Sequence, residues 1–92
     1  MVKTTKRGSK VWVTFTVPAG DYESVHLKGS WDGWETREMK VKKNGEFYTT
    51  RVVPAGERYE FGYITDSNGW MTDESLPTVG TPFGSLNSVL EL

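Results

Sequence analysis

The sequence contains no cysteine and only one histidine, which narrows the chemistry that the chain can carry. Without cysteine there is no disulfide scaffold and no thiolate metal site, so a chain of 92 residues must be held together by its core. The single histidine, His26, has no carboxylate partners that the sequence places beside it, and alone it makes no metal site. We therefore predict no metal and no other cofactor.

The chain also lacks an excess of positive charge and any long apolar run. Eleven Lys and Arg residues stand against twelve Asp and Glu residues, so the chain lacks the basic excess that nucleic-acid backbones attract. No apolar stretch approaches membrane-spanning length, and the polar, basic residues 1–10 contain no signal-peptide core. These absences predict a soluble, cytoplasmic chain with no nucleic-acid or membrane partner.

Helical periodicity is nearly absent, whereas apolar and polar residues often alternate at a period of two. The alternating segments are residues 10–17, 25–29, 38–42 and 59–65. Asn44-Gly45 favours a tight antiparallel hairpin into residues 47–53, whose inward face the alternation does not identify. Short strands without helices predict an all-β fold, an antiparallel β-sandwich of two packed sheets.

The ends of the chain and one long segment lack this alternation. Residues 1–9 are predicted to form a flexible basic tail, and residues 10–92 a single β-sandwich domain. Proline and glycine interrupt the segment between Trp70 and Asn87, which predicts a long loop. Residues 88–92 are predicted to form the closing strand.

Tryptophan is concentrated at predicted turns. Trp31 and Trp34 flank Asp32-Gly33 at a strand end, and Trp70 follows the turn at residues 66–69. An indole has a large apolar area and one donor, so two exposed indoles at one end of a β scaffold suit a flat, amphipathic ring such as a sugar. We expect Trp31 to pack into the core and the N-terminal tail to cover Trp12 in part.

Four segments, in this order and at this spacing, resemble the glycogen-binding modules of carbohydrate-binding module family 48. They are residues 25–34 (VHLKGSWDGW), 53–56 (VPAG), 63–73 (YITDSNGWMTD) and 83–89 (FGSLNSV). Such modules occur in the β subunit of AMP-activated protein kinase and at the N-termini of isoamylases and branching enzymes. The resemblance implies an early-set, immunoglobulin-like sandwich that binds α-glucans such as glycogen, starch and maltodextrins.

The resemblance also implies roles for individual residues. Trp34 and Trp70 would stack on α-linked glucose units, and Phe83 would wedge against the curve of the glucan. Asn87 would donate to sugar hydroxyls, with Ser85 as a helper. If each stacked indole contributes on the order of 1–3 kcal/mol, two indoles support roughly millimolar to micromolar affinity.

One position departs from the pattern of the family. Gly62 stands where binding members tend to have a lysine in the strand before the Asp turn, so one polar sugar contact is missing. Either the affinity is lower, or another residue such as Lys28 or Tyr63 substitutes for the lysine.

The sequence argues against catalysis and leaves two hypotheses for the function. Glycoside hydrolysis needs two carboxylates facing each other across a cleft, and a single shallow sandwich has no enclosed pocket to raise the pKa of one of them. The chain is therefore predicted to be a non-catalytic α-glucan binder, or alternatively a non-binding domain that packs against a glycoside-processing catalytic domain or a kinase-like subunit. The missing lysine favours the second hypothesis, and the presence of both indoles with Asn87 favours the first.

Overall fold

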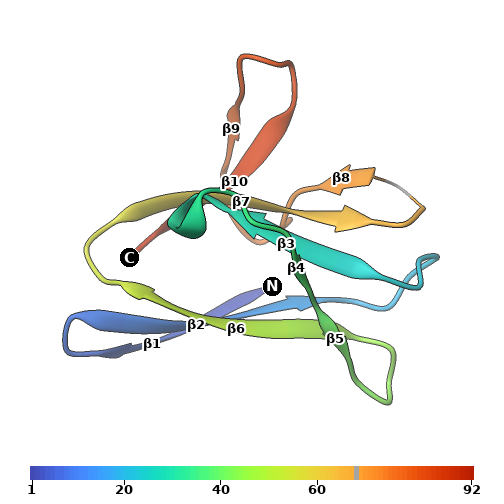
Figure 1. Cartoon of the computed structure of the whole chain (residues 1–92), viewed down its shortest axis with the longest axis horizontal. Coiled ribbons are helices and arrows are strands. Elements are labelled where there is room, and N and C mark those ends of the chain that lie inside the picture. Colours follow the sequence, from blue (N-terminus) through green and yellow to red (C-terminus); the bar gives the residue numbers. More distant parts are fainter. Residues whose placement is uncertain (68) are drawn as a thin grey trace.

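The computed structural model describes residues 1–67 and 69–92, which form two antiparallel sheets packed face to face (Figure 1). The four-stranded sheet has the order β1 (Val2–Arg7), β2 (Lys10–Val17), β6 (Phe47–Pro54) and β5 (Lys40–Val41). The six-stranded sheet has the order β4 (Arg37–Glu38), β3 (Val25–Gly29), β7 (Arg58–Thr65), β10 (Leu86–Glu91) and β9 (Thr78–Gly80), with β8 (Gly69–Met71) paired to β7. The predicted all-β, immunoglobulin-like sandwich is confirmed.

Two-residue alternation places the core correctly. The inward residues of the 10–17, 25–29 and 59–65 segments are all buried between the sheets, and they are Val11, Val13, Phe15, Val17, Val25, Leu27, Tyr59, Phe61 and Tyr63. In β6, whose alternation is ambiguous, Phe47 and Val53 are buried, so the odd-numbered residues face inward. Burial of each large apolar side chain contributes roughly 1.5–3 kcal/mol.

The prediction that residues 1–9 form a flexible tail is wrong for most of this segment. Residues Val2–Arg7 form β1, which pairs with β2 from Val2 opposite Phe15 to Arg7 opposite Lys10. The backbone pairing with β2 is what orders this segment, because its side chains are mostly polar and exposed.

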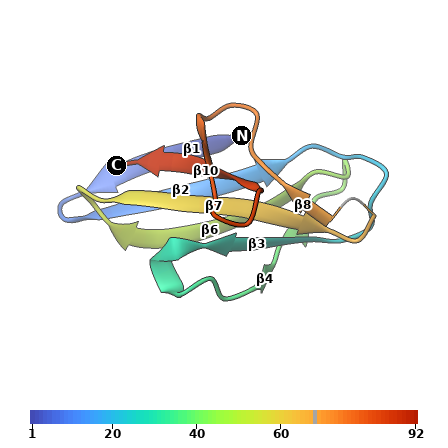
Figure 2. The same ribbon diagram turned by 90° about the horizontal axis from the view of Figure 1, so that it is seen from above.

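The structure also differs in detail from two other predictions, the strand at residues 38–42 and the long loop between Trp70 and Asn87. The chain changes sheets at the buried Met39, because β4 pairs with β3 and β5 pairs with β6. The predicted loop contains β9, which forms a hairpin with β10 that projects from the sandwich (Figures 1 and 2). Asn68, in the predicted turn before Trp70, lies outside the described residues. Among the residues described, no helix is long and apolar enough to cross a membrane; the one short helical element is the 3₁₀ turn η1 (Ser30–Asp32).

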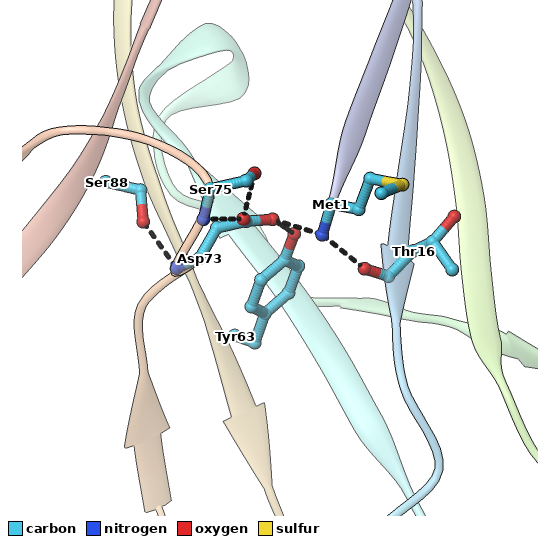
Figure 3. A network of polar contacts seen from close by, with 6 residues as sticks. All are labelled: Met1, Thr16, Tyr63, Asp73, Ser75 and Ser88. Atoms are coloured by element: carbon cyan, nitrogen blue, oxygen red, sulfur yellow. Dashed lines mark hydrogen bonds and ion pairs between the residues drawn. The ribbon is translucent and has the colours of Figure 1, made fainter.

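A buried carboxylate, Asp73, ties the two sheets together at one end (Figure 3). Its Oδ2 accepts from the Tyr63 hydroxyl at 2.8 Å and from the Met1 ammonium at 2.7 Å, and that ammonium also donates to the Thr16 carbonyl. The Ser75 backbone N–H and hydroxyl donate to the other oxygen, Oδ1. Burial alone would raise the pKa of Asp73, but these hydrogen bonds outweigh burial and lower it.

Acidification is expected to destabilise the fold through Asp73. Because the folded-state pKa of Asp73 lies below the unfolded value near 3.9, its stabilisation is complete above about pH 5 and is lost as the pH falls through the folded-state pKa. Urea unfolding at about pH 7 and about pH 3 should show a larger loss for the wild type than for Asp73→Asn. Equal losses in the two proteins would contradict the assignment.

Candidate functional site

A groove of about 540 Å³ lies on the outward face of the six-stranded sheet, beside the projecting β9–β10 hairpin. Its lining residues come from β3, β7, β8, β9, β10 and the connections between them. They are Lys28, Trp34, Glu60, Trp70, Val79, Gly80, Thr81, Pro82, Phe83, Ser85 and Asn87. The structure thus brings together all five residues that the sequence singles out, from segments more than fifty positions apart.

Trp34 and Trp70 lie side by side in this groove. Their ring centroids are 6.4 Å apart and their planes meet at 51°, and both side chains are half-buried. Trp34 has a φ of 67°, in the left-handed region that few non-glycine residues adopt, and its N–H donates to the Gly29 carbonyl at 3.0 Å. Backbone strain of this kind gathers at binding sites. The geometry gives a tilted pair of indole faces that converge on one space.

Trp70 is fixed from two sides. Its Nε1–H donates to the Leu86 carbonyl at 2.6 Å, which joins β8 to the start of β10. Beneath the ring lies Gly62, where an added Cβ would come within 2.1 Å of Trp70 Cζ2. A side chain at position 62 would therefore displace this indole, so Gly62 is the residue that makes room for Trp70.

If the groove binds the α-glucan that the resemblance implies, Gly62→Ala should weaken that binding by displacing the Trp70 ring and its bond to Leu86. Gly80→Ala is the matched control, since Gly80 lines the same groove but an added Cβ there meets nothing within 4 Å. The measurement is calorimetric titration with β-cyclodextrin, together with circular dichroism as a test of folding. Unchanged binding by folded Gly62→Ala would contradict this role of Gly62.

Phe83 stands at the tip of the β9–β10 hairpin with 94% of its surface exposed. The hairpin is nonetheless well tied: the Thr81 N–H donates to the Ser85 carbonyl at 2.9 Å, and the Thr81 and Ser85 hydroxyls share a 2.8 Å hydrogen bond. Gly84 adopts a φ of 83°, which closes the turn. An ordered turn thus holds a large apolar side chain in water beside the groove.

The polar groups of the groove are more enclosed than the sequence suggests. Asn87 is 8% exposed, and its Nδ2 donates to Glu60 Oε1 at 3.1 Å. Glu60 also accepts from Arg58 Nη1 at 3.2 Å, and both groups are partly exposed, so this pair contributes little to stability. Glu60 therefore holds the Asn87 amide in one orientation at the floor of the groove.

Lys28 and Tyr63, the two residues expected to supply a further polar sugar contact, differ in their access to the groove. Lys28 lies opposite Gly62 in the β3–β7 pairing and lines the groove. Tyr63 cannot supply this contact, because its side chain is 1% exposed and bonds Asp73 in the core. Burial, followed by the Asp73 carboxylate, raises the pKa of Tyr63 and keeps it a neutral donor.

The other two tryptophans lie outside the groove. Trp31 packs against Phe15 and Phe61 of the core, with ring centroids 5.2 and 6.0 Å apart, as expected. Trp12 lies on the outer face of the four-stranded sheet, and Arg7 of β1 partly covers it, with Cζ 5.4 Å from the ring centroid.

Sequence reasoning missed five residues that line the groove, Glu60, Val79, Gly80, Thr81 and Pro82, of which Glu60 and Thr81 make polar contacts there. The outward alternation of β7 contains the signal for Glu60, since Glu60 and Gly62 share one face of that strand. Thr81 has no such signal, because its role depends on the turn that brings it to Ser85.

The fold is that of a carbohydrate-binding β-sandwich module. Residues 11–92 match the family described as the glycogen recognition site of AMP-activated protein kinase, and the chain belongs to this family. The resemblance found in the sequence is thereby confirmed.

The curated relatives are subunits of protein kinases. The SNF1-related protein kinase regulatory subunit beta-2 of Arabidopsis thaliana is 30% identical over 70 residues, which cover 76% of this chain and 24% of the relative. The 5'-AMP-activated protein kinase subunit beta-2 of Mus musculus is 26% identical over 70 residues, covering 76% and 25%. The chain therefore spans about a quarter of the length of these relatives.

Solved structures share the fold over nearly the whole chain. A pullulanase complexed with maltotriose, from an Anoxybacillus species, is 26% identical with a TM-score of 0.65, covering 99% of this chain and 13% of that one. The enterobactin esterase FES of Shigella flexneri superposes with a TM-score of 0.79 at 12% identity, covering 99% and 32%, and shows the fold alone.

Proposed function

We propose that this chain binds α-glucans such as glycogen, starch and maltodextrins without catalysis, through the groove that contains Trp34 and Trp70. The observation that carries the proposal is the tilted indole pair, 6.4 Å apart, beside the exposed Phe83. The C–H strips of successive glucose rings pack on indole faces, and a bent platform suits the curve of an α-linked chain better than a flat one.

The polar groups around the indoles complete the proposed site. Asn87, held by Glu60, presents an amide at the floor, and Lys28 supplies a cationic donor from β3. Ser85 and Thr81 add hydroxyls from the hairpin. Such a site orients sugar hydroxyls around a stacked ring, as ligand grooves commonly do with a few placed polar groups.

The absence of catalysis is part of the proposal, and the roles of the carboxylates support it. Asp32 pairs with Arg51 at 3.2 Å, and Asp66 accepts from the backbone N–H of Glu23 and Ser24. Asp73 lies in the inter-sheet network. Each of these carboxylates has a structural partner, and none of them lines the groove.

The test is a titration of the intact, folded chain with β-cyclodextrin while tryptophan emission is recorded. Cellohexaose, with β-linked glucose, is the matched control ligand. Saturable change with β-cyclodextrin at roughly micromolar to millimolar concentration, and little with cellohexaose, is expected. A flat titration would reject the proposal and leave the alternative, a domain that packs against a catalytic domain or another subunit.

Phe83→Ala is expected to weaken binding of maltoheptaose and of β-cyclodextrin several-fold while leaving stability within about 0.5 kcal/mol, because the side chain is exposed. Phe83→Leu keeps part of the apolar bulk and should lose less affinity than Phe83→Ala. Calorimetry and thermal unfolding measure the two effects. Full affinity in Phe83→Ala would remove Phe83 from the site.

A further inference from the structure

A second groove lies on the outer face of the four-stranded sheet, on the other layer of the sandwich from the first groove. Its volume is about 430 Å³, and its lining residues are Lys3, Thr5, Arg7, Trp12, Thr14 and Thr50. Strand register places them together, since Thr5 lies opposite Trp12, and Thr14 lies opposite both Lys3 and Thr50. None of these residues belongs to the site described above.

This outer face is cationic although the chain as a whole has a net charge of −1. The strand register identifies the residues that point outward from this sheet. They include four cations and no carboxylate, and the cations are Lys3, Arg7, Lys10 and Lys40. Lys42, just after β5, lies 5.3 Å from the ring centroid of Tyr48 on the same sheet. Within residues 1–67 and 69–92 none of these five cations forms an ion pair. Glu46, the one acidic residue between β5 and β6, accepts from Asn44 Nδ2.

The groove combines this charge with groups that suit a sugar. Trp12 is 38% exposed, and the Arg7 guanidinium stacks on it with Cζ 5.4 Å from the ring centroid. Stacking restrains the guanidinium, whose planar N–H donors match a phosphate. The Thr14 and Thr50 hydroxyls lie 3.0 Å apart and form a polar row beside the indole. An indole edge, hydroxyls and a restrained guanidinium are the contacts that a phosphorylated sugar would use.

We propose that this second groove binds glucose units that carry a phosphate monoester, so that one module contacts neutral glucan through one sheet and phosphorylated glucan through the other. The proposal rests on the proposed function, because it takes an α-glucan as the ligand. The phosphate accepts from Arg7 and Lys3, and the sugar ring packs against the edge of Trp12 that Arg7 leaves open. A polymer that engages both grooves gains avidity without any new contact.

The occupant is a glucan rather than another polyanion because of the shape and content of the surface. Single-stranded nucleic acid uses several aromatic side chains in succession along a basic channel, whereas this groove contains one indole. The core of a stable protein interface is depleted of charged residues, whereas four cations and the threonines of the groove surround the apolar pair Trp12 and Val52 on this face.

The experiment compares phosphorylated potato amylopectin with the same polymer after enzymatic dephosphorylation, by affinity electrophoresis of the whole chain at low salt. The wild type is expected to bind the phosphorylated polymer about tenfold more tightly, and the double variant Lys3→Gln/Arg7→Gln is expected to lose this preference. Lys43→Gln, an exposed lysine outside the groove, is the charge control and should retain it. Trp70→Ala should weaken binding of both polymers and keep their ratio.

Several results would overturn the inference. They are equal affinity of the wild type for the two polymers, a preference that survives Lys3→Gln/Arg7→Gln, and equal competition by polyglutamate or by single-stranded DNA of matched charge. The last result would assign the face to a different class of partner. Neutral β-cyclodextrin carries no phosphate, so failure to bind it rejects the first site, whereas β-cyclodextrin binding without a phosphate preference rejects only the second.

Discussion

Trp70→Ala is expected to weaken binding of β-cyclodextrin by about 5- to 150-fold, which corresponds to the roughly 1–3 kcal/mol that one stacked aromatic ring contributes. The indole lies on the outward face of β8 over Gly62, and its Nε1–H anchors it to the Leu86 carbonyl. Its loss removes one of the two faces on which a glucose ring packs. The core residues are untouched, so the protein should remain folded.

Two matched variants separate stacking from a general loss of structure. Trp70→Phe keeps an aromatic face but loses the bond to Leu86, and it should bind with intermediate affinity. Trp12→Ala removes an exposed indole from the opposite sheet and should bind neutral β-cyclodextrin as the wild type does. Equal losses in Trp70→Ala and Trp12→Ala would contradict the assignment of the first groove.

Asp73→Ala is expected to lower the free energy of unfolding by about 3–5 kcal/mol, since hydrogen bonds to a buried charge contribute about 1.5–3 kcal/mol each and breaking such a network leaves partners unpaired. The largest part of the loss comes from Tyr63, because its buried hydroxyl loses its hydrogen-bond acceptor. The Met1 ammonium is largely exposed and can be solvated instead, so it adds little to the loss. Against a total of roughly 5–15 kcal/mol, the effect is large.

Urea denaturation measures this loss, and a double-mutant cycle with Tyr63→Phe locates it. If the bond between Tyr63 and Asp73 carries much of the effect, the double variant should be more stable than the sum of the single losses predicts. Asp21→Ala, which removes an exposed carboxylate from the turn between β2 and β3, is the control and should change stability by less than about 0.5 kcal/mol. A loss under about 1 kcal/mol for Asp73→Ala would contradict the account.

The sequence predicts those parts of the fold that depend on apolar alternation. Residues 10–17 alternate cleanly because one face packs on the core and the other meets water, and the structure has β2 there. Apolar alternation does not predict β1, because its side chains are mostly polar on both faces. Pairing with the β2 backbone orders this strand. The sequence does not predict β9, because Gly80 ends this strand and Pro77 and Pro82 flank it; the pairing with β10 holds it extended.

In the candidate site, too, the sequence predicts some features, and others depend on how the strands pair. The resemblance selects Trp34, Trp70 and Phe83, and the structure places all three at one groove. The sequence does not show why position 62 is a glycine. The contact between that position and the Trp70 ring arises when β7 and β8 pair. The bond from Asn87 to Glu60 likewise depends on the pairing of β10 with β7.

The most direct test of the central claim follows the indole N–H resonances of the four tryptophans by NMR while β-cyclodextrin is added. Each indole reports on its own surroundings, and Trp12 on the opposite sheet serves as the internal reference. Saturable shifts with a common dissociation constant are expected for Trp34 and Trp70, and none for Trp12. Shifts at Trp12 instead, or no shift at Trp34 and Trp70, would contradict the claim.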